Sequence, residues 1–457
     1  MQYERSDWVL LMIVALISLS TLTEQNEEKP TKGAGIGTRV RRAYKQNVSC
    51  IAHDVKFTCD CQNSHQHMQL PHLVGSAFQV EISNCKSLTI DANSLENTQG
   101  LRKVTFKNIA NLVLERNALS FPQYASNTPL IIEFDQVHFE VIDSHAINGN
   151  VEEISFIGGR IDLIHPFGFT TLNNRAVLLK MENVSVKRIE PQAFKKFSVD
   201  QMEITNCVFE TNLPSKAFYE LEVLNMLRIN NVQFKEIHSK AFSFKLVSKL
   251  SISNNCFNGV DAEWIEAHVR ESSVIRDNNF GATTQISFRG ITLHRDYVSS
   301  EKLELQFKNN TVRFPLTGLR PLDFSDRFHL NIEQLHYENT FSCKDLNTSF
   351  KPPRPRVEFF QRFADKILFQ RNDNQSFLSL SKIVEMDCKQ PSYLLYIILA
   401  VLALVLVVIV IVAVVWLRIS RKNKRRKIDV VLPEPRTYKE TQIVYQIENA
   451  GLLKTDL

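Results

Sequence analysis

Two carboxylates and a lysine come closest to a catalytic set in this sequence: Glu133, Asp135 and Lys180. An enzyme that acts on polysaccharides would need such groups on neighbouring strands for acid–base chemistry. These residues instead belong to sequence repeats that are two apart, and the chain has no nucleophile elbow, phosphate-binding loop or H-E-x-x-H motif. We therefore expect neither an enzyme nor a bound cofactor.

Cysteines and glycosylation sequons offer chemistry of another kind. The chain contains 8 cysteines, and disulfides form and persist in oxidising compartments. Asparagines in N-x-S/T sequons accept N-linked glycans on exported proteins. They are Asn47, Asn183, Asn309, Asn347 and Asn374. Both patterns gain meaning only if the chain is exported.

Two apolar segments indicate an exported, membrane-anchored chain. Residues 1–23 combine Arg5, an uncharged core and small polar residues, which is typical of a signal peptide. An uncleaved anchor is the alternative, although the core is shorter than a membrane span. Residues 393–417 contain no charge over 25 positions, which predicts a transmembrane helix. Basic residues crowd the segment 418–427, so the positive-inside rule places the N-terminus outside and residues 418–457 in the cytoplasm.

The charge balance excludes nucleic acid as the main partner. The chain has 54 Lys or Arg and 49 Asp or Glu, a net charge of +5. Residues 418–457 hold 10 basic and 5 acidic side chains, so the rest of the chain is formally neutral. A nucleic-acid-binding protein would instead carry its basic patch on the folded part.

Between the two apolar segments, the sequence repeats every 22 to 28 residues. Apolar residues fill position 1 of each unit and position 3, two residues later, and this period of two predicts a short strand. Position 1 holds Val80, Val104, Ile132, Ile154, Leu179, Met202, Leu227 and Leu250. Position 3 holds Ile82, Phe106, Phe134, Phe156, Met181, Ile204, Ile229 and Ile252. Weaker matches extend the repeat to residue 340, for about eleven units.

Other positions of the unit are less regular. Positions 6 and 8 are mostly apolar, with Ser87 and Asn111 as exceptions at position 8. A small residue followed by a large one recurs between the strands, as in Ala193-Phe194 and Ala217-Phe218. We expect this pair to lie in a turn of helix that packs behind the strand.

These units resemble the extracellular leucine-rich repeat family, whose unit is L-x-x-L-x-L-x-x-N-x-L followed by I-x-x-x-A-F and a helical turn. The best matches are MLRINNVQFKEIHSKAF at 226–242 and KLSISNNCFNGV at 249–260. The resemblance implies an α/β solenoid of horseshoe shape over residues 80–340. Position 6, the asparagine position of that family, holds Asn only from Asn255 onward. This departure keeps a right-handed parallel β-helix as the alternative fold.

The resemblance also implies disulfide-bonded caps, because a stacked repeat exposes its core at both ends. An N-terminal cap would span 43–79 and a C-terminal cap would lie within 341–391. The cysteines that would pair among themselves at the N-terminal end are Cys50, Cys59, Cys61 and Cys85, and those at the C-terminal end are Cys343 and Cys388.

Cys207 and Cys256 are left over. They lie two repeats apart, which is about 10 Å at one strand spacing per repeat, and this exceeds the reach of a disulfide. We expect both as buried free thiols.

In a leucine-rich repeat, the residues between the buried positions face the concave surface, and a rigid solenoid is a platform for binding proteins. The charged residues that we expect on this ligand-binding surface are Glu81, Lys107, Glu133, Asp135, Lys180, Glu182, Glu203 and Arg228. A glycan on Asn183 would restrict approach to its edge.

Short motifs flank the solenoid. R-V-R-R from Arg39 to Arg42 is similar to a proprotein convertase site, which predicts processing after a flexible pro-segment, 24–42. The cytoplasmic tail ends in two motifs that overlap. An acidic dileucine signal for clathrin adaptors comprises Glu448, Leu452 and Leu453, and a PDZ-domain ligand comprises Thr455 and Leu457.

The sequence thus predicts a single-pass type I plasma-membrane glycoprotein whose solenoid binds an extracellular or cell-surface protein. It would act as a receptor, co-receptor or adhesion protein, with adaptor and PDZ contacts at its tail. The alternatives are a matrix-tethering or trafficking glycoprotein without a signalling role and, further away, a polysaccharide-acting β-helix enzyme.

Overall fold

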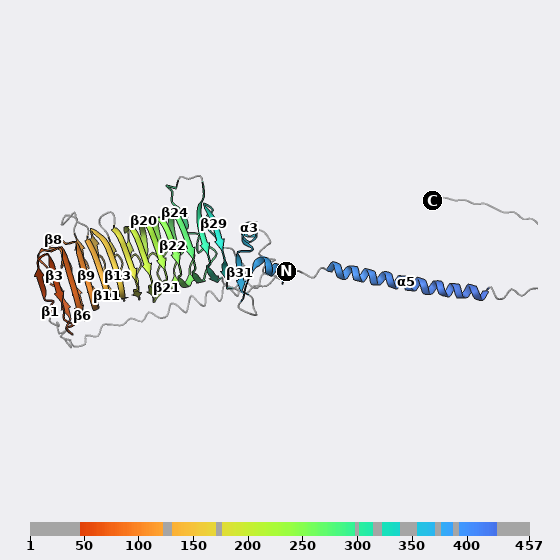
Figure 1. Cartoon of the computed structure of the whole chain (residues 1–457), viewed down its shortest axis with the longest axis horizontal. Helices are drawn as coiled ribbons and strands as arrows, with labels where there is room; N and C mark the ends of the chain where they lie inside the picture. The colour runs from red at the N-terminus through yellow and green to blue at the C-terminus, as the bar shows by residue number, and fades with distance from the viewer. Residues whose placement is uncertain are drawn as a thin grey trace, which may run out of the picture. The chain divides into compact units, whose positions relative to one another are not determined.

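The computed structural model describes residues 46–121, 130–170, 176–297, 301–313, 322–338, 354–370, 376–386 and 393–426. The chain divides into two compact units, Met1–Leu380 and Ser381–Leu457. The first unit is a β-solenoid of about 11 turns, in which each turn pairs in parallel with the next (Figure 1).

Most turns contribute strands to three parallel sheets along the solenoid, which we call the main, second and third sheets. The main sheet contains β3 (Lys56–Asp60), β6 (Gln79–Cys85), β9 (Lys103–Leu114), β11 (Leu130–Ile142), β13 (Val151–Ile161), β15 (Ala176–Glu182), β18 (Ser198–Thr205), β20 (Phe218–Asn230), β22 (Phe242–Ser253), β24 (Ile265–Arg276), β27 (Leu303–Lys308) and β29 (Phe328–Glu333).

The long strands of the main sheet continue into the other two sheets. The second sheet contains the ends of β9, β11 and β13 with β1 (Gln46–Asn47), β4 (Met68–Gln69), β7 (Leu88–Ile90), β16 (Ser185–Val186), β19 (Val208–Phe209), β21 (Gln233–Ile237), β23 (Cys256–Val260), β25 (Asn279–Ala282), β28 (Thr311–Arg313), β30 (Leu335–Tyr337) and β31 (Ile367–Gln370). The third sheet contains the beginnings of β20, β22 and β24 with β5 (Gly75–Ser76), β8 (Thr98–Gln99), β10 (Leu119–Phe121), β12 (Ile147–Gly149), β14 (Phe169–Thr170), β17 (Phe194–Lys195) and β26 (Ile291–Leu293).

The core is built as the repeat predicts. All sixteen residues at positions 1 and 3 from Val80 to Ile252 are at most 1% exposed. Equivalent side chains stack from turn to turn: Phe134 lies between Phe106 and Phe156 at centroid distances of 4.9 and 5.0 Å. These distances match the spacing of paired strands, so the parallel register brings identical positions into contact along the solenoid.

The expectation of a helical turn behind each strand is wrong. The small–large pairs lie at the third sheet, where Phe194 stacks on Phe169 at 4.3 Å and on Phe218 at 4.6 Å. The backbone N–H and C=O groups of this segment form hydrogen bonds with neighbouring turns through strand pairing. In a helix they would instead bond within the segment itself. The fold therefore fits the alternative of a parallel β-helix, and the leucine-rich repeat horseshoe is not confirmed.

Residues with positive φ angles bend most of the described turns at two corners, and the apolar pattern predicts neither corner. One lies at position 5, directly after the main-sheet strand, and its residues have positive φ angles. Asparagine, which tolerates this conformation better than most residues, fills most of these positions. They are Asn84, Asn108, Gln136, Gly158, Asn183, Asn206, Asn231, Asn254, Asp277, Asn309 and Gln334. The other corner precedes the small–large pair, as at Asn117 and Gln192.

Position 6 changes character along the solenoid. In most turns before residue 255 an apolar residue or cysteine is buried there, and at Gly159 a Cβ atom would overlap the carbonyl oxygen of Val137. Asn255, Asn278 and Asn310 are at most 3% exposed and form a ladder of hydrogen bonds. The Asn255 and Asn278 side chains donate to the next asparagine Oδ1, both at 2.9 Å.

Position 8 also needs a correction. Ser87 and Asn111 are only half-buried, and the following residues, Leu88 and Leu112, fill the core instead with exposures of 0%. Irregular pairing between β9 and β11 accommodates the additional residue, because Phe139 pairs with Leu112 after a register shift.

The four N-terminal cysteines pair among themselves, as expected. Cys50–Cys59 links β2 (Cys50–His53) to β3 in an antiparallel hairpin, and Cys61–Cys85 fastens this hairpin to β6. At the other end, β32 (Phe377–Ser379) pairs with β31, close to α3 (Arg354–Phe363) and α4 (Leu380–Met386) in sequence. Cys343 and Cys388 lie outside the described residues.

The prediction of two buried thiols is half wrong. Cys207 is 1% exposed, and its Sγ donates to the carbonyl oxygen of Thr205 at 3.2 Å. Burial raises the pKa of this thiol to about 11. Cys256, however, is exposed. It follows the inward-pointing Asn255, so the alternation of side chains along the chain turns it outward.

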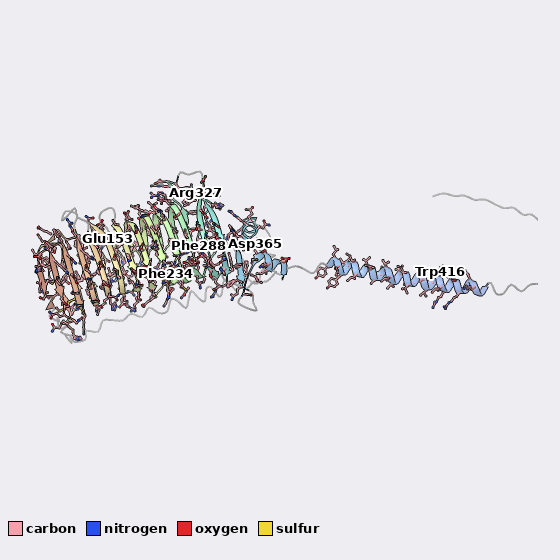
Figure 2. The ribbon with its side chains drawn as sticks, viewed as in Figure 1. Glu153, Phe234, Phe288, Arg327, Asp365 and Trp416 are labelled. Carbon is pink, nitrogen blue, oxygen red and sulfur yellow. A yellow bond between two sulfur atoms is a disulfide. The ribbon has the colours of Figure 1, made fainter. Side chains whose placement is uncertain are left out.

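The second unit contains α5 (Tyr393–Arg426), which is long and apolar enough to cross a membrane. Its apolar side chains are not covered within the described structure, as Trp416 illustrates at 68% exposure (Figure 2). A helix that is apolar on every side requires an apolar environment, which a bilayer provides.

Candidate functional site

Side chains at positions 2 and 4 of the main-sheet strands point away from the core, and we call this surface the outer face. All eight residues that the sequence predicted for ligand binding lie on it, spread over the strands from β6 to β20. The parallel register orders them into two rows. One row runs through Glu81, Thr105, Glu133, Ser155, Lys180, Glu203 and Arg228, and the other through Ser83, Lys107, Asp135, Ile157, Glu182, Thr205 and Asn230.

Several of these charges neutralise one another. Lys180 Nζ lies 2.6 Å from Glu182 Oε2, and Arg228 lies 3.8 Å from Glu203. The hydrogen bond from Lys56 lowers the pKa of Glu81, against a smaller opposing effect of burial. Such partly exposed pairs contribute little to stability, so they are free to exchange partners with a ligand.

Asp135 and Lys107 differ from their neighbours. They face each other across β11 and β9, but neither forms an ion pair within the part of the chain that the structure describes. Two half-buried apolar side chains lie on the same face, Ile157 one strand and Leu178 two strands from Asp135. Apolar surface surrounded by charged and polar groups is typical of protein-binding surfaces.

The enzyme alternative gains no support from this arrangement. Glu133 and Asp135 on β11 are separated from Lys180 on β15 by the whole of β13, about 10 Å at two strand spacings. Lys180 is already paired with Glu182. Among the residues that the structure describes, no group of histidine, cysteine or carboxylate side chains could hold a metal ion.

The sequons are concentrated on another side of the solenoid. Asn183 and Asn309 are exposed at the corner between the main and second sheets. Asn47 is exposed on β1, which pairs with β4 in the second sheet. Glycans on these three residues would cover the second sheet and leave the third-sheet edge of the outer face open. Asn347 and Asn374 lie outside the described residues.

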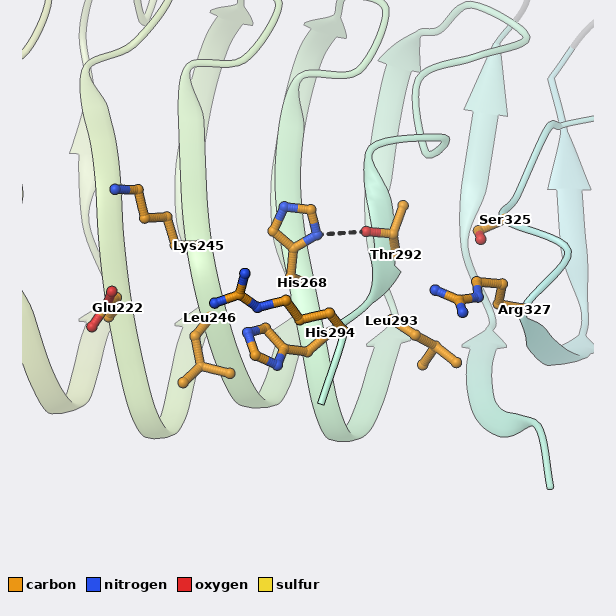
Figure 3. A pocket seen from close by; sticks show the side chains of 10 residues that line it. Glu222, Lys245, Leu246, His268, Thr292, Leu293, His294, Ser325 and Arg327 are labelled. Carbon is orange, nitrogen blue, oxygen red and sulfur yellow. Dashed lines mark hydrogen bonds between the residues drawn. The ribbon is translucent and has the colours of Figure 1, made fainter. Parts of the chain in front are cut away.

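A second candidate site is a pocket of about 630 Å³ where the third sheet continues into the main sheet (Figure 3). Lys245, His268 and Arg327 line it, and the hydroxyl of Thr292 lies 2.7 Å from His268 Nδ1. Burial lowers the pKa of His268; Glu266 opposes this shift and His294 adds to it. At neutral pH this imidazole is therefore uncharged.

The apolar pattern does not predict this pocket, although the sequence contains one signal for it. The turn that begins at Ser273 is 32 residues long, counted from Ser273 at position 1 to Leu305 at the next position 1. The other turns are 22 to 28 residues long. The additional chain follows β26, because Leu293 still pairs with Val269, and its first residues, His294 and Arg295, line the pocket. A longer turn inserts chain at one corner of a solenoid, and such insertions often form binding surfaces.

No family model matches this chain, and no curated protein matches it. The processing site at Arg39 and Arg42 lies outside the described residues, as do both tail motifs, with Glu448, Leu452, Leu453, Thr455 and Leu457.

Proposed function

We propose that this chain is a cell-surface receptor, co-receptor or adhesion protein that binds an extracellular protein through the outer face of its main sheet. The observation that carries the proposal is the outer face itself, where charged side chains from six of seven successive strands surround half-buried apolar ones. Asp135 and Lys107 are available there for a partner because they form no ion pair with the described residues.

Membrane attachment and topology are part of the proposal. Two disulfides support an oxidising compartment, and α5 supports a single membrane span. Arg418, Arg421 and Lys422 at the end of α5 favour a type I orientation in the plasma membrane. The tail would then contribute the adaptor and PDZ contacts that its motifs predict.

The repeat class also remains a proposal. Asn255 and its two equivalents occupy the asparagine position of extracellular leucine-rich repeats, and they bond to neighbouring backbones: Asn255 Oδ1 accepts from Val232 N at 2.9 Å. We infer a divergent leucine-rich repeat in which strands replace the helical turns.

The test is a binding screen with the full-length protein on the surface of cells, against secreted and cell-surface proteins including the protein itself. A partner should lose at least tenfold in affinity on charge reversal of Glu133, Asp135 and Glu182 to lysine. The matched control reverses Glu140, Glu236 and Asp261, which are exposed on or beside the second sheet. Equal losses in both variants would contradict the proposal.

Two outcomes of this screen separate the remaining roles. Binding to itself, with aggregation of expressing cells, would identify adhesion. The absence of any partner, together with a phenotype that survives deletion of residues 428–457, would favour a matrix-tethering role.

A further inference from the structure

The pocket beside the third sheet has the size and lining of a small-molecule site. Its volume of about 630 Å³ falls within the range of ligand pockets, which is roughly 300–1,000 Å³. Leu246 and Leu293 give it apolar walls, and the hydroxyls of Thr292 and Ser325 add hydrogen-bonding groups. Part of its lining comes from strands of successive turns, where Glu222 pairs with Leu246 and His268 with Thr292, so the solenoid holds these residues in fixed register.

The charges that line the pocket are mainly positive. Lys245, Arg295 and Arg327 contribute three cations, and Glu222 contributes the one lining carboxylate. Figure 3 shows Lys245 on β22 and Arg327, directly before β29, toward opposite ends of the pocket, with His268 and Thr292 between them. The net lining charge is therefore positive with His268 neutral.

Neighbouring carboxylates reduce but do not cancel this charge. Lys245 Nζ lies 3.1 Å from Glu220, and Arg295 lies 3.9 Å from Asp296, at the limit of an ion pair. Arg327 forms no ion pair with a described residue, although its side chain lines the pocket. An unpaired guanidinium beside hydroxyl donors is suited to an oxyanion, which it can bind through two parallel hydrogen bonds.

We propose that this pocket binds the oxyanion of a small ligand, a sulfate or phosphate group carried by a sugar or present as the free ion. The volume leaves room for about one or two sugar rings beside the anion. The described sequons lie toward the second sheet, so their glycans would not obstruct the opening. The inference is independent of the outer face and of the protein partner proposed for it.

Calorimetric titration of the full-length protein in lipid nanodiscs tests the proposal. The probes are a sulfated disaccharide, the same disaccharide without sulfate, inorganic sulfate and inorganic phosphate. The pocket variant combines Arg295→Ser with Arg327→Ser. The matched control combines Arg116→Ser with Arg188→Ser, two exposed arginines on other turns that carry the same charge change.

We expect at least one sulfated or phosphate probe to bind, and the pocket variant to weaken it at least tenfold while the control leaves it unchanged. Tighter binding of the sulfated disaccharide than of both ions would identify a sulfated sugar as the source. Equal binding of the ions alone would identify a free anion. Equal affinity for the desulfated disaccharide, equal weakening in both variants, or no binding of any probe would overturn the proposal.

Discussion

The turns of the solenoid before residue 255 and the turns after it stack in the same register but close their corners differently. In the first region, position 6 is buried and mostly apolar, as at Val137 and Val232. In the second, three asparagines replace these residues and link successive turns by hydrogen bonds. The second region also has the longest of the described turns, and the pocket lies where the two regions meet, between Lys245 and Arg327. A polar ladder can therefore replace apolar stacking only where every amide finds a partner.

The largest expected effect is at the centre of this ladder. Asn278→Ala removes a side chain that donates to the carbonyl oxygen of Ile252 at 3.0 Å and accepts from Asn255 N at 3.0 Å. Because these buried groups lose their partners, we expect a loss of about 3 kcal/mol in stability. Hydrogen exchange measured by mass spectrometry should show faster exchange around Asn255. Asn225→Ala, at an exposed position, is the control; protection equal to wild type in the Asn278 variant would contradict the ladder.

In the first region, a substitution at position 6 should lower stability only through lost packing. Val137 is 1% exposed, so Val137→Ala should cost about 2 kcal/mol through two lost methyl groups and the cavity that they leave. Val177, at 37% exposure, provides the matched substitution and should change stability little. Thermal unfolding of both variants measures the difference. Equal melting temperatures would mean that position 6 does not organise these turns.

Cys207 and Cys256, the free cysteines of the described residues, extend the comparison to adjacent positions of the repeat. Cys207 fills position 6 in the first region, and burial raises its pKa to about 11, so almost no thiolate exists near neutral pH. Cys256 follows position 6 in the second region and is exposed. We expect a thiol reagent at pH 7.5 to label Cys256 in the native protein at least a hundredfold faster than Cys207, as quantified by peptide mapping. Comparable labelling of both would show that the first region opens readily.

The smallest expected effect is on the pH dependence of thermal stability. Burial lowers the pKa values of His268 and His336 below the ordinary 6.5. As the pH falls, these histidines therefore take up protons in the unfolded chain before they do so in the folded one. Their contribution to the free energy of unfolding is complete above pH 6.5 and is lost as the pH falls toward their folded pKa values. Melting temperatures between pH 7.5 and 5.5 should fall less in His268→Gln and His336→Gln variants than in wild type. Identical slopes would contradict the assignment.

The sequence predicted the core better than the corners. The buried residues at positions 1 and 3 could be predicted because burial on one side of a strand imposes a period of two. Small–large pairs such as Ala193 and Phe194 fit either a helical turn or a short strand, and only pairing between turns decides which of the two forms. The left-handed asparagines, such as Asn206 and Asn231, formed a visible column, but apolar periodicity does not report backbone conformation.

The position of the outer face could be predicted from the sequence, but its ion pairs and the pocket could not. Alternation along each strand places residues such as Glu133 and Asp135 on the outer face, because the side chains on either side of them are buried. Which of these charges pair depends on the side-chain conformations of residues in different turns, as with Lys103 and Glu133. The pocket depends on the path of an inserted segment, which follows no repeat.

The central claim is that a protein partner binds the outer face of the main sheet, and a glycan placed there tests it most directly. Lys180→Asn with Glu182→Thr creates a sequon on β15, at two residues that point outward. Gln233→Asn with Lys235→Thr creates the matched sequon on β21 of the second sheet. The account predicts that cells displaying the first variant lose the partner and cells displaying the second retain it. Retention by the first variant, with both sites shown to be glycosylated, would contradict it.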